Sequence, residues 1–200
     1  PNDAAVSSTT LEKMEQDLPQ AARLLAPELG LKSLGYACTS GSSIIGEARV
    51  DQILKRIHPG VPCSNPLEAA KAAFLALDVS RIGLVTPYTP EVTRSVEDNF
   101  SKSGVAVSVV GSFFEINDVK VGKISEKSIL KAAISVGQDP RCEAVFISCT
   151  SLRSAKVIAK AEAQLGKPVI SSNSALAWHL LRLAGIHDKA PEAGTLFSQH

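Results

Sequence analysis

The chain has 200 residues, of which 44% are hydrophobic and 4% aromatic, a mainly aliphatic set such as parallel sheets covered by helices bury. Its 21 basic and 20 acidic residues give a net charge of +1, which supplies no electrostatic reason to expect nucleic acid or an anionic membrane as a partner. No apolar run approaches the ~18 residues of a membrane span. We therefore expect a protein that binds neither nucleic acid nor membrane.

The cysteines indicate a reducing compartment. Cys38, Cys63, Cys142 and Cys149 form no C-x-x-C pair and no framework of a small secreted domain, so we expect free thiols and a cytoplasmic protein. The four histidines are scattered, and none stands at ligand spacing from a cysteine. No metal site is expected.

Hydrophobic periodicity predicts an alternation of helices and strands along the chain. The predicted strands are 31–37, 61–63, 81–86, 105–110, 143–148 and 168–171, and the predicted helices are 10–25, 43–57, 67–77, 91–101, 125–136, 151–165 and 174–184. Residues 111–124 form a longer connection. Such alternation implies parallel strands joined by right-handed crossovers, so the predicted fold class is α/β.

One tripeptide occurs twice, each time where a predicted strand ends and a helical pattern follows. Cys38-Thr39-Ser40 follows 34–37, and Cys149-Thr150-Ser151 follows 144–148. Ligands of open α/β sheets bind at such strand ends, and helix N-termini lower thiol pKa values. A cysteine that ends a buried strand is more often a small core residue, and we interpret Cys63 in that way.

The repetition extends beyond the tripeptides, which favours a functional interpretation of both thiols. Each is followed by a helix, a short segment with proline and asparagine, and another helix. Asn65 follows Cys38 by 27 residues, and Asn173 follows Cys149 by 24. The chain thus resembles two related α/β halves that face each other.

Hydroxyl groups cluster beside both thiols. Thr39 and Ser40 in the first half, and Thr150 and Ser151 in the second, supply groups that bind carboxylate oxygens at helix N-termini. Tyr88 stands just after strand 81–86, where its phenol could bind a carboxylate. The alternative interpretations are helix capping for the hydroxyls and packing for the tyrosine.

Four segments together resemble a known group of enzymes. The segments are 36–42 (YACTSGS), 84–88 (LVTPY), 146–153 (FISCTSLR) and 166–173 (GKPVISSN). They resemble the aspartate/glutamate racemase superfamily, in its branch of maleate cis-trans isomerases and arylmalonate decarboxylases. The chain looks most similar to the racemase-like proteins associated with ectoine utilisation.

This resemblance implies a fold and an organisation. The expected fold has two pseudo-symmetric, flavodoxin-like lobes, each a parallel sheet flanked by helices, with the site between them. Residues 1–80 with 168–200 would form the N-terminal lobe and 81–167 the second lobe. Members of the superfamily open with a strand and a polar loop, and we expect the first strand of the N-terminal lobe to be absent from this chain. The resemblance further implies a homodimer and an enzyme without a cofactor.

The resemblance also implies roles for individual residues. Cys38 and Cys149 match the catalytic thiols, and Tyr88 matches a carboxylate-binding tyrosine. The asparagine that these enzymes tend to carry before the helix at 125 is matched by Asn117, with Asp118 as the alternative. In a maleate isomerase the first thiolate would add to the double bond, and in a racemase the two thiols would be base and acid on opposite faces of one carbon.

The expected substrate is therefore a small carboxylate, either maleate or an acidic or N-acylated amino acid. Free aspartate or glutamate is disfavoured, because Ser151 stands where amino-acid racemases of the superfamily carry histidine. Decarboxylation is disfavoured, because arylmalonate decarboxylases have glycine at the position of Cys38. The remaining alternative is a non-catalytic carboxylate-binding protein with the same fold.

Overall fold

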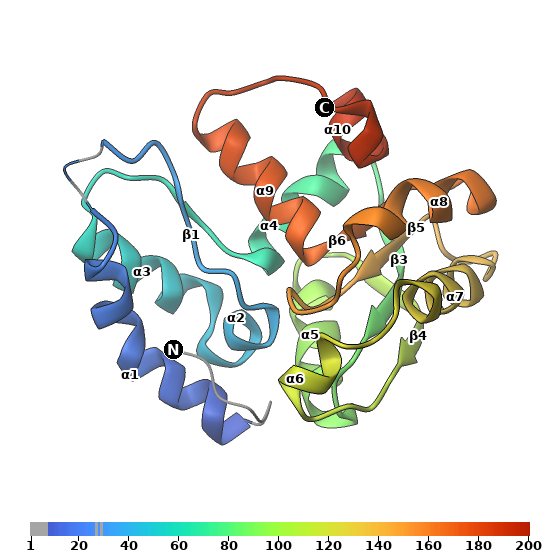
Figure 1. The fold of residues 1–200 in the computed structure, drawn as a ribbon, viewed down its shortest axis with the longest axis horizontal. Helices are drawn as coiled ribbons and strands as arrows, with labels where there is room; N and C mark the ends of the chain where they lie inside the picture. The colour runs from blue at the N-terminus through green and yellow to red at the C-terminus, as the bar shows by residue number, and fades with distance from the viewer. Residues whose placement is uncertain (1–7, 27, 29) are drawn as a thin grey trace.

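The computed structural model describes residues 8–26, 28 and 30–200. Helices and strands alternate along most of this range, as the periodicity predicts (Figure 1). The helices are α1 (Ser8–Arg23), α2 (Thr39–Ile45), α3 (Glu47–Ile57), α4 (Pro66–Ala76), α5 (Pro90–Lys102), α6 (Asp118–Val121), α7 (Glu126–Gly137), α8 (Ala155–Leu165), α9 (Ser172–Leu183) and α10 (Thr195–Gln199). The strands are β1 (Leu34–Gly35), β2 (Cys63–Ser64), β3 (Arg81–Thr86), β4 (Ala106–Ser112), β5 (Ala144–Ile147) and β6 (Val169–Ser171).

The strands form two separate parallel sheets. The smaller sheet pairs β1 with β2, and the larger sheet has the order β4-β3-β5-β6. In Figure 1 the smaller sheet lies with α1, α2 and α3 on one side of the molecule, and the larger sheet lies on the other. Parallel sheets flanked by helices confirm the predicted fold class.

The larger sheet lies between two helical layers, which bury β3, β5 and β6 and leave the edge strand β4 partly exposed. On one face, Phe74 of α4, Phe100 of α5 and Phe146 of β5 meet edge to face, with ring centroids 5.4 to 5.7 Å apart. On the other face, Gly137 of α7 lies against Val145 of β5 and Leu165 of α8. Because a side chain at position 137 would overlap both residues, the glycine lets α7 pack closely against α8 and the sheet. This packing fixes the positions of the strand ends where the predicted site residues lie.

The smaller sheet has a hydrophobic core of its own. Apolar residues of α1 and α3 cover it on one side, among them Leu18 and Ile53, together with Leu34 and Tyr36. Helix α9 covers the other side, where Leu180 lies against Gly35 and its carbonyl accepts a hydrogen bond from the Ser33 hydroxyl at 2.9 Å. Because α9 follows β6 directly, the C-terminal part of the chain joins the two sheets.

Two predicted helices differ from the structure. The predicted helix 43–57 is two helices, because Gly46 at φ +93 ends α2 and begins α3. The predicted helix 151–165 begins only at Ala155, and residues 150–154 form a turn. Helix α2 therefore begins directly after Cys38, whereas no helix begins directly after Cys149.

The proposed lobe boundaries, 1–80 with 168–200 and 81–167, are crossed by two elements. Strand β6 pairs with β5 in the larger sheet, and α4 contributes Leu67 and Phe74 to the core of that sheet. The division into lobes stays a proposal. The expectation about a missing first strand concerns a segment outside the described residues.

Candidate active site

Cys38 is the N-cap residue of α2. Its sulfur accepts a hydrogen bond from the Gly41 N–H at 3.3 Å and lies 3.7 Å from the Ser40 hydroxyl. The residue is only partly buried. The helix N-terminus thus presents donors to the sulfur, as a thiolate requires.

Cys149 is held differently, in the turn between β5 and α8. Its φ is +109, an angle that residues other than glycine seldom adopt. Its backbone N–H donates to the Ser172 hydroxyl at 3.0 Å, and its side chain is 5% exposed. Backbone strain of this kind persists where surrounding contacts hold it, and it is common at functional sites.

The two thiols share one electrostatic environment. The buried Tyr88 hydroxyl hydrogen-bonds the side chains of Cys149 and Ser40, and both thiols act on the pKa of that hydroxyl. Cys38 in turn contributes to raising the pKa of Cys149. The structure therefore brings together four predicted site residues, Cys38, Ser40, Tyr88 and Cys149, from three different segments.

Burial reverses the expected direction of both thiol pKa values. The pKa of Cys149 is raised to about 11, because the effect of burial is larger than the opposing effect of the hydrogen bonds from Tyr88 and the Ser151 N–H. Burial also raises the pKa of Cys38, against the donors at Gly41, Ser40 and Tyr36. The expectation of depressed thiol pKa values is wrong, because desolvation of the charged form outweighs the hydrogen bonds that lower the pKa of each thiol.

A hydrogen-bond chain joins the two thiol-bearing segments. The Thr39 hydroxyl donates to Ser172 Oγ at 2.7 Å, and the same Oγ accepts the Cys149 N–H. The Thr150 hydroxyl donates to the Ala37 carbonyl at 3.0 Å, and Asn173 Nδ2 donates to the Thr150 carbonyl at 2.9 Å. The hydroxyls of Thr39 and Thr150 therefore have protein acceptors, and their predicted role in substrate binding stays a prediction.

The connection before α7 brings a carboxylate to the site. Asp118, the first residue of α6, accepts a hydrogen bond from the Ser151 hydroxyl at 2.8 Å. Its charge contributes to raising the pKa of both Cys38 and Cys149. Asn117, the residue we preferred from the sequence, instead caps α6 by accepting from the Lys120 N–H at 3.0 Å. Of the two candidates, Asp118 is therefore the one whose charge acts on both thiols.

Sequence reasoning missed two residues of this site. Ser172 is fully buried and links Thr39 to the backbone of Cys149. Tyr36 places its hydroxyl beside the Cys38 sulfur. Both stand in segments that carry the family resemblance, 36–42 and 166–173, so the resemblance was the available signal, although neither residue was singled out within its segment.

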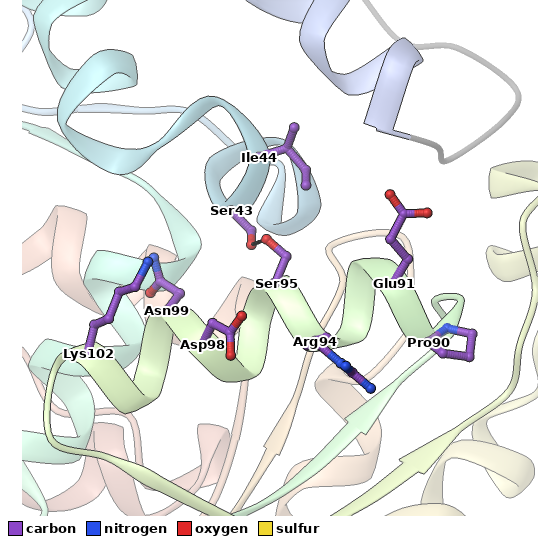
Figure 2. A pocket seen from close by; sticks show the side chains of 9 residues that line it. All are labelled: Ser43, Ile44, Pro90, Glu91, Arg94, Ser95, Asp98, Asn99 and Lys102. Atoms are coloured by element: carbon purple, nitrogen blue, oxygen red, sulfur yellow. Dashed lines mark hydrogen bonds between the residues drawn. The ribbon is translucent and has the colours of Figure 1, made fainter.

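A separate surface groove of about 540 Å³ lies between α2 and α5, where the Ser43 and Ser95 hydroxyls hydrogen-bond (Figure 2). Its lining carries both signs of charge, with Arg94 and Lys102 beside Glu91 and Asp98. None of the predicted site residues lines it, so we do not assign it to the thiol site.

Among the described residues, no group of three or more His, Cys, Asp or Glu side chains could hold a metal ion. No helix in that part of the chain is long and apolar enough to cross a membrane.

An α/β fold that brings two thiols and a buried tyrosine together at strand ends defines a class of protein with a paired-cysteine site. The family model described as arylmalonate decarboxylase matches residues 4–197. The chain belongs to this family, and the resemblance to the racemase superfamily branch is confirmed.

Named relatives include two different activities. Maleate isomerase of Alcaligenes faecalis is 22% identical over 172 residues, which cover 82% of this chain and 68% of the relative. Arylmalonate decarboxylase of Bordetella bronchiseptica is 26% identical over 149 residues, 74% of this chain and 62% of the relative. A structure of a Nocardia farcinica maleate cis-trans isomerase mutant with a covalently bound succinylcysteine intermediate is 23% identical and superposes with a TM-score of 0.89 over 98% of this chain and 83% of that one.

Proposed function

We propose that this protein is an isomerase of small carboxylic acids that works through Cys38 and Cys149. The observation that carries the proposal is the convergence of the two thiols on one environment that also contains Tyr88. The family includes maleate isomerases, which supports this class of reaction. We propose cis-trans isomerisation of a maleate-like dicarboxylate as the first candidate.

Cys38 is the better nucleophile of the pair on structural grounds. Cys38 is a partly exposed residue whose sulfur accepts the Gly41 N–H in the first turn of α2, whereas Cys149 is buried. As a thiolate, Cys38 would form a sulfur–carbon bond while the double bond opens, and the neighbouring carbon would take the proton of Cys149. The succinylcysteine intermediate named for the Nocardia farcinica relative is the product of such an addition.

The rest of the cycle restores both groups. After rotation about the new single bond, the Cys149 thiolate removes a proton from the carbon that was protonated. The sulfur–carbon bond then breaks, the double bond re-forms in the trans arrangement, and Cys38 leaves as a thiolate. Tyr88 lies between these groups, hydrogen-bonded to the Cys149 side chain, and would stabilise negative charge on sulfur or on a substrate carboxylate.

Asp118 favours a second candidate, racemisation of an acidic or N-acylated amino acid. A carboxylate that acts on both thiols repels a second carboxylate of a substrate, but it accepts hydrogen bonds from an ammonium or amide N–H. In that reaction one thiolate removes the α-proton and the opposite thiol returns one. The ectoine-related racemase activity belongs to this candidate.

Proton NMR in deuterated buffer distinguishes the candidates. Purified protein is incubated with maleate, then with N-acetylated and free acidic amino acids. Fumarate that forms with wild type and not with Cys38→Ala would establish cis-trans isomerisation. Deuterium that enters an α position without a change of carbon skeleton would establish racemisation. A folded protein that is silent on all of these substrates, or that loses CO₂ from an arylmalonate, would contradict both.

Binding without turnover is the remaining alternative, and the same samples test it. Isothermal titration with maleate measures binding by wild type and by Cys38→Ala. Equal binding by both, with no turnover by either, would support a carboxylate-binding protein instead of an isomerase.

A further inference from the structure

Tyr36 carries a buried hydroxyl that the proposed reaction does not yet use. The residue is 8% exposed, and its hydroxyl oxygen has no regular hydrogen-bond partner in the described part of the chain. Its backbone is fixed on both sides, because the Tyr36 N–H donates to the Ser64 carbonyl at 3.0 Å and the Cys38 N–H donates to the Tyr36 carbonyl at 3.1 Å. The ring therefore has a defined position between the smaller sheet and the thiol.

The hydroxyl reaches the thiol because residue 41 is glycine. A Cβ atom on Gly41 would overlap the Tyr36 hydroxyl oxygen and would lie 3.1 Å from the Cys38 sulfur. The hydroxyl and the sulfur thus meet over the first turn of α2, on the side where the Gly41 N–H donates to the sulfur at 3.3 Å. A side chain at 41 would separate them.

In the resting protein the Tyr36 hydroxyl lies beside the neutral Cys38 thiol, which is a weak acceptor, and phenylalanine would fill the same space without a poorly satisfied buried hydroxyl. A hydroxyl hydrogen rotates freely to suit its acceptor. Once Cys38 becomes a thiolate, the tyrosine hydroxyl gains a charged acceptor, and such hydrogen bonds are stronger than neutral ones.

We propose that Tyr36 is a positioning residue whose hydroxyl donates to the Cys38 thiolate, and that Gly41 is required to admit it.

The local electrostatics agree with this role. The Tyr36 hydroxyl lowers the pKa of Cys38, although burial raises that pKa by more. Burial raises the pKa of Tyr36 itself well above its ordinary value, and the neighbouring Cys38 raises it further. The hydroxyl therefore keeps its proton and remains a donor throughout the pH range in which the thiol ionises.

The second thiol has a comparable partner. The chain contains two tyrosines, and the other one, Tyr88, hydrogen-bonds Cys149. Each thiol of the pair thus has a tyrosine of its own. Tyr88→Phe is the matched control for Tyr36→Phe, because the two substitutions remove the same atom beside different sulfurs.

The test is iodoacetamide alkylation at a series of pH values, with each cysteine followed separately by peptide mass spectrometry. Tyr36→Phe should slow the alkylation of Cys38 about tenfold at neutral pH and move its pKa up by about one unit, the size of one hydrogen bond to a charged group. Cys149 should respond more to Tyr88→Phe. An unchanged Cys38 profile in Tyr36→Phe would overturn the proposal.

Thermal unfolding separates this role from simple packing. Tyr36→Phe removes a hydroxyl without a regular partner, so its melting temperature should equal or exceed that of wild type. A clear fall in melting temperature with no change in Cys38 reactivity would show that the tyrosine is only structural.

Gly41→Ala gives a second, independent variant. The methyl group should displace the tyrosine hydroxyl and slow Cys38 alkylation by a similar factor. Adding Gly41→Ala to Tyr36→Phe should then slow it little further, because both changes remove one interaction. Fully additive effects would contradict the proposal. Alkylation requires no substrate, so this result stands whichever reaction the site performs.

Discussion

The two Cys-Thr-Ser segments have the same sequence but different structures. Cys38 caps a helix, is partly exposed and faces the backbone N–H of Gly41. Cys149 lies in a turn at φ +109, is buried and is held through its own N–H by Ser172. From their identical sequences we expected the two thiols to have similar surroundings. The surroundings differ because a helix begins directly after Cys38, whereas a turn follows Cys149.

This difference assigns different tasks to the two thiols. Cys38, a partly exposed residue that caps a helix, is the better placed of the two to attack a substrate, whereas the buried Cys149 thiol, whose pKa is about 11, keeps its proton at neutral pH and can donate it. A pair with unequal environments suits a reaction that needs one nucleophile and one acid. The predictions below test this inequality.

The largest expected effect is loss of activity when either thiol is removed. Cys38→Ser keeps an oxygen that can cap α2, and Cys149→Ser keeps the size of the side chain. Each should lower turnover by about a thousandfold or more, because each removes a group of the proposed chemistry. The NMR assay measures turnover, and circular dichroism checks the fold.

Cys63→Ala is the matched control for those variants. Cys63 is buried in the core of the smaller sheet and donates to the Val61 carbonyl, outside the thiol pair. The Cys63→Ala variant should retain wild-type turnover. Substantial turnover in Cys149→Ser would remove the assignment of that thiol as the acid.

Ser172→Ala should be the most destabilising change at the site. It leaves the Cys149 N–H and the Thr39 hydroxyl without their acceptor, and each orphaned buried donor costs about 1–3 kcal/mol. Denaturant unfolding should show a loss of about 2–4 kcal/mol. Ser198→Ala, whose hydroxyl only donates to the Thr195 carbonyl, is the control, and an equal loss there would contradict this role of Ser172.

Stability should fall at alkaline pH through Cys149. Its pKa is about 11 in the folded protein and about 8.5 in an unfolded chain, so the folded state binds the proton more tightly. The contribution is fully present below pH 8.5 and is lost as the pH rises to 11, by about 3 kcal/mol, since one pKa unit corresponds to about 1.4 kcal/mol. Cys149→Ser should flatten that part of the stability profile, and a profile as steep as that of wild type would count against the raised pKa.

The smallest expected effect concerns the backbone of Cys149. Glycine adopts φ values near +109 without the strain that a side chain causes. Cys149→Gly should therefore be more stable than Cys149→Ala by about 1 kcal/mol, although both are inactive. The comparison uses two variants that both lack the thiol. Greater stability of the alanine variant would show that the backbone is not strained there.

The sequence predicted the elements whose signals are local. Strand β3 has its predicted bounds, and α4 begins at Pro66, one residue before its predicted start, with Asn65 as its N-cap. The late start of α8 was not predictable, because tertiary contacts hold Cys149 at a positive φ that its residue type does not indicate. Gly46 itself was the available sign that the predicted helix 43–57 would be divided, but one glycine inside a helical pattern is often tolerated.

The candidate site was predictable as a set of residue types but not as a set of contacts. The repeated tripeptide pointed to both thiols, the strand end before Tyr88 pointed to its phenol, and the resemblance added a role for each. The roles of Ser172 and Asp118 depend on which strands and helices become neighbours, which spacing alone does not determine. Burial decides that both thiol pKa values are raised. The sequence indicated a helix N-terminus, which lowers a thiol pKa, but it did not show how deeply each thiol is buried.

One measurement tests most directly whether the two thiols form a single site. The alkylation of Cys149 is followed against pH in wild type and in Cys38→Ser, which replaces an ionisable thiol by a hydroxyl of similar shape. Because Cys38 contributes to raising the pKa of Cys149, the variant should show Cys149 reacting at lower pH. An unchanged pH profile of Cys149 alkylation would contradict the account, since it would mean that Cys38 has no electrostatic effect on Cys149.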